Sequence, residues 1–221
     1  RFAKGFPNVM AMLCAGGSGR VDYGAMPYFH SFWPSDNTDP LGRIKIQWGF
    51  SHFFPANTIS AHVTRMGKRH LKMAIDVALS GAFGIDLALD KATAEERAQI
   101  ADAVKLYKER IRPLVMHGEL YRLVSPYESP LASLSYVSTD KQKAVVYFYQ
   151  TKDGNEPRVM LGGLDAHKKY RVEEVSLAKG VASRFPANGK GFTGAELMEK
   201  GLENPLNTQF ESAVLILVAN N

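Results

Sequence analysis

The segment Trp33-Pro34-Ser35-Asp36-Asn37-Thr38-Asp39-Pro40 contains an aromatic plate and two carboxyl groups at short spacing. An indole such as Trp33 can stack on the face of a sugar ring. A carboxyl group beside such a plate loses part of its hydration, which favours its protonated form, and a general acid needs that form. Asp36 is the candidate acid, with a helix cap as its alternative. Asp39 directly precedes Pro40, so we predict that it caps a helix that begins there.

A second segment that can approach a ligand is Cys14-Ala15-Gly16-Gly17-Ser18-Gly19-Arg20. Because glycine has no Cβ, backbone at these positions can come close to a bound molecule. The segment lacks both the spacing of a dinucleotide-binding fingerprint and the Lys-Ser/Thr of a phosphate loop. Taken alone, it is as typical of a surface loop as of a binding site.

Both segments follow short apolar runs, which alternate with amphipathic stretches as far as about residue 118. Val9–Cys14 reads as a strand buried on both faces. We predict further strands at Ser31–Pro34, Thr58–Val63 and Ala82–Ile85, and helices from Pro40, over Leu71–Leu79 and after a capping box at Thr93–Glu96. Strands separated by helices indicate parallel pairing, and four such units make half of an eight-stranded barrel. In such a barrel, catalytic groups lie on the loops after the strands.

From Leu131 onward the hydrophobic period changes to two, which is typical of antiparallel strands. Two apolar stretches flank the polar turn Ser138–Lys143 and predict a hairpin. Further strands are expected at Pro157–Leu161, Lys169–Val175 and Phe210–Val218. The predicted fold is therefore α/β and then all-β. The second half of a (β/α)₈ barrel is expected over residues 1–125, and a small antiparallel β-sandwich over residues 126–221.

Composition excludes several other classes of function. The formal net charge of +5 comes without a basic patch that carries interleaved aromatic residues, so we expect no nucleic-acid partner. No apolar run is long enough to span a bilayer, and no secretory signal opens the chain, so no membrane partner is expected and the compartment stays unknown. Cys14 is the single cysteine, and the six histidines show no metal-ligand spacing. We expect neither a metal nor a cofactor.

The two loops together resemble a known family. Cys14–Arg20, Val21–Gly24 and Trp33–Asp39 are similar to the signature of glycoside hydrolase family 36 α-galactosidases, and further matches extend over the first 130 residues. The resemblance implies a (β/α)₈ barrel followed by an antiparallel β domain, which hydrolyses terminal α-galactosides with retention. It implies that Asp36 is the catalytic acid/base and Trp33 a supporting wall. It also implies that Cys14 lines the galactose site and that the backbone at Gly16 and Gly17 lies near the sugar hydroxyls.

The chain departs from the family pattern in two ways. The loop between His62 and His70 is shorter than usual, which affects the subsites beyond galactose. The Lys-Trp-Asp motif that carries the family's nucleophile is absent, and the chain does not begin with Met. We therefore expect a fragment that lacks the N-terminal half of the barrel, that is inactive alone, and that pairs with that half or with another copy of itself. The alternatives are an α-N-acetylgalactosaminidase, a galactosyl transferase, or a non-catalytic carbohydrate-binding or scaffold module.

Overall fold

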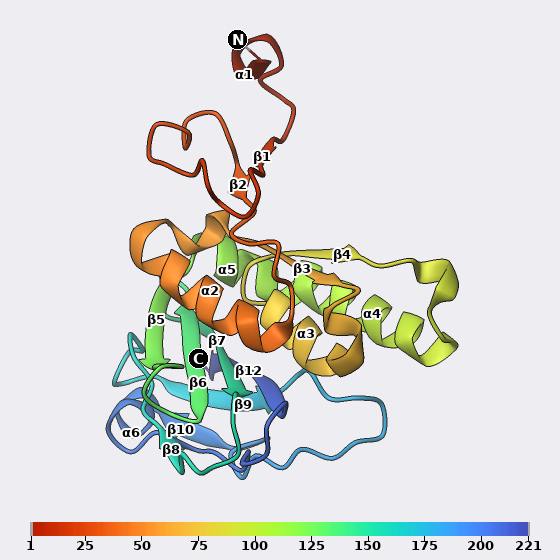
Figure 1. Ribbon diagram of the computed structural model, residues 1–221. Coiled ribbons are helices and arrows are strands. Elements are labelled where there is room, and N and C mark those ends of the chain that lie inside the picture. The colour runs from red at the N-terminus through yellow and green to blue at the C-terminus, as the bar shows by residue number, and fades with distance from the viewer. Residues whose placement is uncertain (1, 221) are drawn as a thin grey trace.

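Four short parallel strands make up the sheet of the first region in the computed structural model, which describes residues 2–220 (Figure 1). Strand β1 (Met12–Leu13) pairs with β2 (Ser31–Phe32), and β3 (Ser60–Thr64) pairs with β4 (Ala82–Asp86). A parallel bridge from Phe32 to Ile59 connects the two pairs. The strands therefore follow one another in sequence order, which confirms the predicted half of a parallel barrel.

A loop of residues 14–30 connects β1 to β2, whereas helices follow β2, β3 and β4 and begin where the sequence predicts. Helix α2 (Pro40–Phe53) is capped by Asp39, whose carboxylate accepts hydrogen bonds from the backbone N–H groups of Leu41 and Gly42. Helix α4 (Ala94–Leu106) opens with the predicted capping box between Thr93 and Glu96. The other helical segments are α1 (Phe2–Gly5), α3 (Leu71–Ala78), a π-helical turn (Tyr107–Ile111), α5 (Arg112–His117), and single 3₁₀ turns at Ala56–Thr58, Gly67–His70 and Leu89–Lys91.

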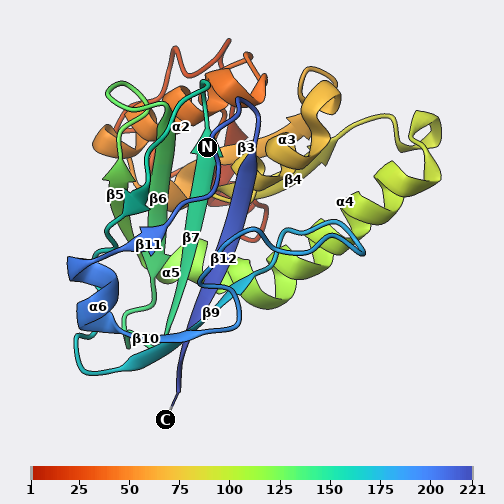
Figure 2. The same cartoon turned by 90° about the horizontal axis from the view of Figure 1, so that it is seen from below.

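The second region is built on a six-stranded antiparallel sheet in the order β10-β9-β12-β7-β6-β5 (Figure 2). Its strands are β5 (Glu119–Val124), β6 (Leu131–Val137), β7 (Lys143–Gln150), β9 (Lys169–Glu174), β10 (Gly191–Thr193) and β12 (Ser212–Asn220). A two-stranded sheet of β8 (Arg158–Val159) and β11 (Leu202–Glu203), with helix α6 (Gly194–Glu199), covers one face. Helices α3 and α5 pack on the other face. The predicted antiparallel domain is confirmed.

Strand β5 was not predicted from the sequence. It pairs with β6, so residues 119–124 belong to the six-stranded sheet although they precede the predicted boundary. The division into 1–125 and 126–221 stays a prediction, and it does not coincide with the edge of this sheet.

Buried tyrosines join the sheet to the barrel strands. Their hydroxyl groups donate hydrogen bonds to carbonyl oxygens in and just after helix α3, where the helix itself leaves acceptors free. The pairs are Tyr149 to Asp76 (3.1 Å), Tyr147 to Leu79 (2.9 Å), Tyr136 to Ser80 (2.8 Å) and Tyr107 to Gly81 (3.0 Å). Tyr136, Tyr147 and Tyr149 lie on β6 and β7, so the six-stranded sheet holds the C-terminal end of α3. Tyr107 comes from the π-helical turn and holds Gly81, which leads into β4.

The first predicted strand is wrong in extent and in burial. Only Met12 and Leu13 pair, and the side chains of Val9, Met10 and Met12 are 47%, 76% and 44% exposed. The reason is that β1 has β2 on one side and, within residues 2–220, no strand along its other edge. An apolar run can be buried on both faces only where neighbouring strands and helices cover it.

Within residues 2–220, no helix is both long and apolar enough to cross a membrane.

Candidate active site

The structure brings the two sequence-predicted loops together at the C-terminal ends of β1 and β2. Gly16 and Gly17 have φ angles of 61° and 76°, which favour glycine. A Cβ on Gly17 would lie 3.2 Å from the Ser35 Cα and 3.3 Å from the Asp36 backbone nitrogen. Gly17 therefore allows the cysteine loop to pack directly against the backbone that carries Asp36.

Trp33 orients the Asp36 carboxylate through a hydrogen bond. The indole Nε1–H donates to Asp36 Oδ1 at 3.0 Å. The predicted desolvation beside the indole is wrong for this chain, because the Asp36 side chain is exposed in the structure. Trp33 contacts the carboxylate through its ring N–H, and nothing in residues 2–220 covers the acid from the solvent side.

Trp33 is itself held by two residues that sequence reasoning did not single out. The Arg43 guanidinium lies over the indole, with Cζ 4.5 Å from the ring centroid, and the His62 ring meets it edge-on at 5.0 Å. Arg43 also donates hydrogen bonds to the carbonyl oxygens of Ser35 (3.0 Å) and Ser60 (3.2 Å). Arg43 and Gln47, one turn apart, are both buried on the inner face of α2. The Trp33 indole is therefore held in place, and the Arg43 guanidinium covers one of its faces.

Burial is the main cause of the shifted pKa values of the two residues that hold Trp33. Burial lowers the pKa of Arg43 to about 10, while the negative charge of Asp36 opposes that shift. The pKa of His62 is also lowered, first by burial and then by the positive charge of Arg43, with Asp86 opposing. Arg43 on α2 thus interacts electrostatically with Asp36 after β2 and with His62 in β3, and His62 also interacts with Asp86 at the end of β4.

The lowered pKa of His62 predicts a pH-dependent stability. The folded protein binds fewer protons at His62 than the unfolded chain does, so the free energy of unfolding rises with pH across that interval. We expect stability to fall as pH drops from the ordinary value of 6.5 through the lowered folded pKa. His62→Gln should flatten this part of a urea midpoint-versus-pH curve, whereas His167→Gln, at an exposed position, should leave it unchanged. Equal curves for the parent and His62→Gln would contradict the burial argument.

Cys14 lies at the start of the glycine-rich loop as a free, exposed thiol. Within residues 2–220 the structure shows no hydrogen bond between this thiol and Asp36. Both nevertheless follow the C-terminal ends of adjacent strands, since β1 pairs with β2. Cys14, Gly16, Gly17, Trp33 and Asp36 therefore lie on two contacting loops, and their roles toward a ligand stay predictions.

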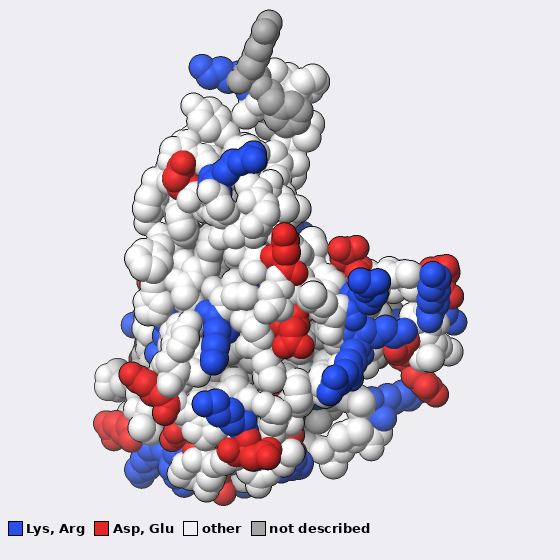
Figure 3. Space-filling view, in the orientation of Figure 1, with Lys and Arg blue, Asp and Glu red and all other residues white. Residues whose placement is uncertain are grey.

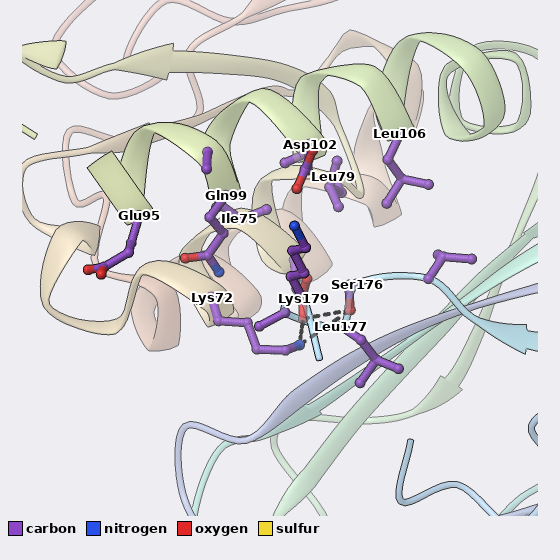
Figure 4. A pocket seen from close by; sticks show the side chains of 15 residues that line it. Lys72, Ile75, Leu79, Glu95, Gln99, Asp102, Leu106, Ser176, Leu177 and Lys179 are labelled. Carbon is purple, nitrogen blue, oxygen red and sulfur yellow. Dashed lines mark hydrogen bonds and ion pairs between the residues drawn. The ribbon is translucent and has the colours of Figure 1, made fainter. Parts of the chain in front are cut away.

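A cavity of about 390 Å³ elsewhere has three polar lining side chains, Lys72, Asp76 and Ser176, that bond to one another (Figure 4). It lies between α3, α4 and residues 175–179. Lys72 Nζ donates to Asp76 Oδ2 (2.5 Å) and to the carbonyl oxygen of Ser212 (2.7 Å), and it reaches Ser176 Oγ at 3.3 Å. These contacts connect α3 to the six-stranded sheet, so the cavity lies at the contact between the two regions.

Comparison with known proteins places this arrangement in a family. The sequence profile of the melibiase family matches residues 1–118, and the profile of the glycosyl hydrolase family 36 C-terminal domain matches residues 131–217. The chain belongs to the melibiase family. The family assigned by the resemblance is thus confirmed.

Relatives of this melibiase-family chain match it over nearly its full length. It is 33% identical over 96% of its residues to probable alpha-galactosidase G of Aspergillus terreus, and 37% identical over 79% to alpha-galactosidase AgaA of Geobacillus stearothermophilus. It spans only 29% and 25% of those two proteins. A crystal structure of a variant of the latter, in complex with raffinose, superposes on 99% of the chain with a TM-score of 0.86 and 32% identity, and the match covers 30% of that structure.

Proposed function

We propose that this chain is the acid/base-bearing part of a retaining α-galactosidase that hydrolyses terminal α-D-galactosides of the melibiose or raffinose type. The observation that carries the proposal is the Asp36 carboxylate on the loop after β2, which accepts the Trp33 indole N–H and whose backbone packs against Gly17. Membership of the melibiase family and the similarity to α-galactosidases support it.

Asp36 performs two proton transfers in this mechanism. As a nucleophilic carboxylate attacks the anomeric carbon, Asp36 donates its proton to the glycosidic oxygen and the bond to the leaving group breaks. The ionised Asp36 then takes a proton from water, which attacks the same carbon and releases the nucleophile. Cys14 and the backbone of Gly16 and Gly17 line the galactose site, and Trp33 fixes the geometry of the acid.

The nucleophile comes from outside this chain in our proposal. The two carboxyl groups of a retaining enzyme lie roughly 5–5.5 Å apart, and the Lys-Trp-Asp motif is absent here. The exposed side chains of Val9 and Met10, just before β1, and of Met12 within it mark the edge where the other half of the barrel packs. The same half covers Asp36 from solvent.

The stereochemistry of the product tests this function. The chain, assembled with a family half barrel that carries the nucleophile, should hydrolyse p-nitrophenyl α-galactoside, and NMR should show α-galactose as the first-formed anomer. β-Galactose as the first product would refute retention. Preference for p-nitrophenyl α-N-acetylgalactosaminide would reassign the substrate, transfer to added sugar would indicate a transferase, and binding without turnover would leave a non-catalytic module.

A further inference from the structure

A pocket of about 360 Å³ opens between the loop after β3 and the loop after β4. One lining residue, Arg65, lies next to the loop of Asp36, because Thr38 contacts both residues that flank Arg65. The Thr38 and Thr64 hydroxyl groups share a hydrogen bond, and the Thr38 backbone N–H donates to Met66 Sδ at 3.5 Å. The lining residues are Arg65, Lys68, Leu71, Asp86, Leu87, Ala88, Lys91, Ala92, Glu96 and Ile100.

Three charged side chains of this pocket have no hydrogen-bonding or ion-pair partner within residues 2–220. Lys68 forms an ion pair with Glu96 at 3.1 Å. Glu96 also accepts a hydrogen bond from the Thr93 backbone N–H at the start of α4, so both side chains already have partners. Within residues 2–220, the side chains of Arg65, Lys91 and Asp86 form no hydrogen bond or ion pair. Figure 3 shows charged side chains of both signs gathered on this side of the molecule.

The chemistry of the pocket matches a sugar. Arg65 and Lys91 only donate hydrogen bonds and an ionised Asp86 only accepts them, whereas each sugar hydroxyl does both. The apolar floor, which includes the buried Ala92 and Ile100, suits the C–H face of a sugar ring.

We infer that this pocket binds the leaving group of the substrate when that group is a sugar, with Arg65, Lys91 and Asp86 as its specificity-determining residues. The inference rests on the proposed α-galactosidase function for the identity of the reaction. In this proposal, the short loop between His62 and His70 contributes to substrate selectivity, because it carries Arg65 next to the Asp36 loop.

Selectivity between two substrates tests the inference in the assembled enzyme. R65M and K91M should each lower kcat/KM for raffinose about tenfold, as expected when a hydrogen bond to a charged group is lost. The value for p-nitrophenyl α-galactoside, whose leaving group has no hydroxyls for the pocket, should stay within about twofold. R69M and K105M are matched controls at exposed cations outside the pocket, and neither substrate should respond to them. Equal losses on both substrates, or none, would overturn the proposal.

A binding measurement separates this inference from the proposed function. Sucrose, the leaving group of raffinose, is titrated into the assembled enzyme while the amide NMR signals of this chain are recorded. Signals of residues 86–92 should shift in the parent and in the R69M/K105M control and stay fixed in R65M/K91M, whether or not the enzyme turns over. Absence of shifts in the parent would overturn the pocket assignment. Loss of hydrolysis with retained shifts would count against the proposed function alone.

Discussion

Asp36→Asn is expected to lower kcat for raffinose about 10²–10⁴-fold in the assembled enzyme, because Asn cannot donate a proton to the departing oxygen. The side chain keeps its size, and its amide oxygen can still accept the Trp33 indole N–H, now at 3.0 Å from Oδ1. The loss therefore reports proton transfer with little change in packing. Steady-state kinetics with raffinose and with aryl galactosides measure it.

The leaving group decides whether Asp36 is the acid. An aryl galactoside with a good leaving group departs with little protonation, so its first step should suffer much less than that of raffinose. Hydrolysis of the galactosyl intermediate, where Asp36 acts as base, should then limit turnover, and added azide should accelerate it by replacing water. Equal losses for both substrates without rescue by azide would show that Asp36 only shapes the site.

Asp39 provides the matched control. Its carboxylate accepts two backbone N–H groups at the start of α2, so Asp39→Ala should cost about 0.5–2 kcal/mol of folding stability in urea denaturation. The remaining folded enzyme should keep a kcat close to that of the parent. A loss of kcat comparable with that of Asp36→Asn would mean that the two carboxyl groups had been assigned the wrong way round.

Local signals were sufficient for much of the fold. Asp39 before Pro40 and the Thr93–Glu96 pair both mark helix starts, and the caps form as the hydrogen-bonding chemistry requires. Period-two alternation revealed the hairpin of β6 and β7. Strand β5 escaped because it follows α5 after Gly118 alone, without a turn segment to separate it, and its pairing with β6 is a tertiary contact.

The sequence predicted the two loops of the site, but it did not predict the residues that hold Trp33 in place. The composition of the loops carrying Cys14 and Asp36 was visible along the chain, and their contact at Gly17 follows from parallel pairing of β1 with β2. The position of Arg43 over Trp33 depends on how α2 packs on the strands, which no local pattern encodes. Whether Asp36 is exposed depends on which segments pack around its loop, and no local pattern encodes that.

The chain alone is expected to release no detectable p-nitrophenol from an aryl α-galactoside. Retention needs a nucleophilic carboxylate opposite the acid, and our assignment gives this chain one catalytic carboxyl group, Asp36. Adding a separately expressed half barrel that carries the nucleophile should restore turnover, and Asp36→Asn in the same mixture should suppress it for raffinose. Turnover by the chain alone at a rate typical of an enzyme would place the nucleophile within it and refute the assignment.

Association should accompany this recovery, because the isolated chain leaves apolar surface and strand edges uncovered. Within residues 2–220, β1 and β4 each have a strand on one side only, and Met10 and Met12 are exposed along the first edge. Such edges drive pairing with another chain. Light scattering should therefore show the chain alone as self-associated, and a one-to-one complex once the other half is added. Replacing Met10 and Met12 by Lys should weaken both assemblies and the restored activity together. A well-dispersed monomer at micromolar concentration would contradict the open half barrel, since burying those edges within one chain requires contacts that the structure does not contain.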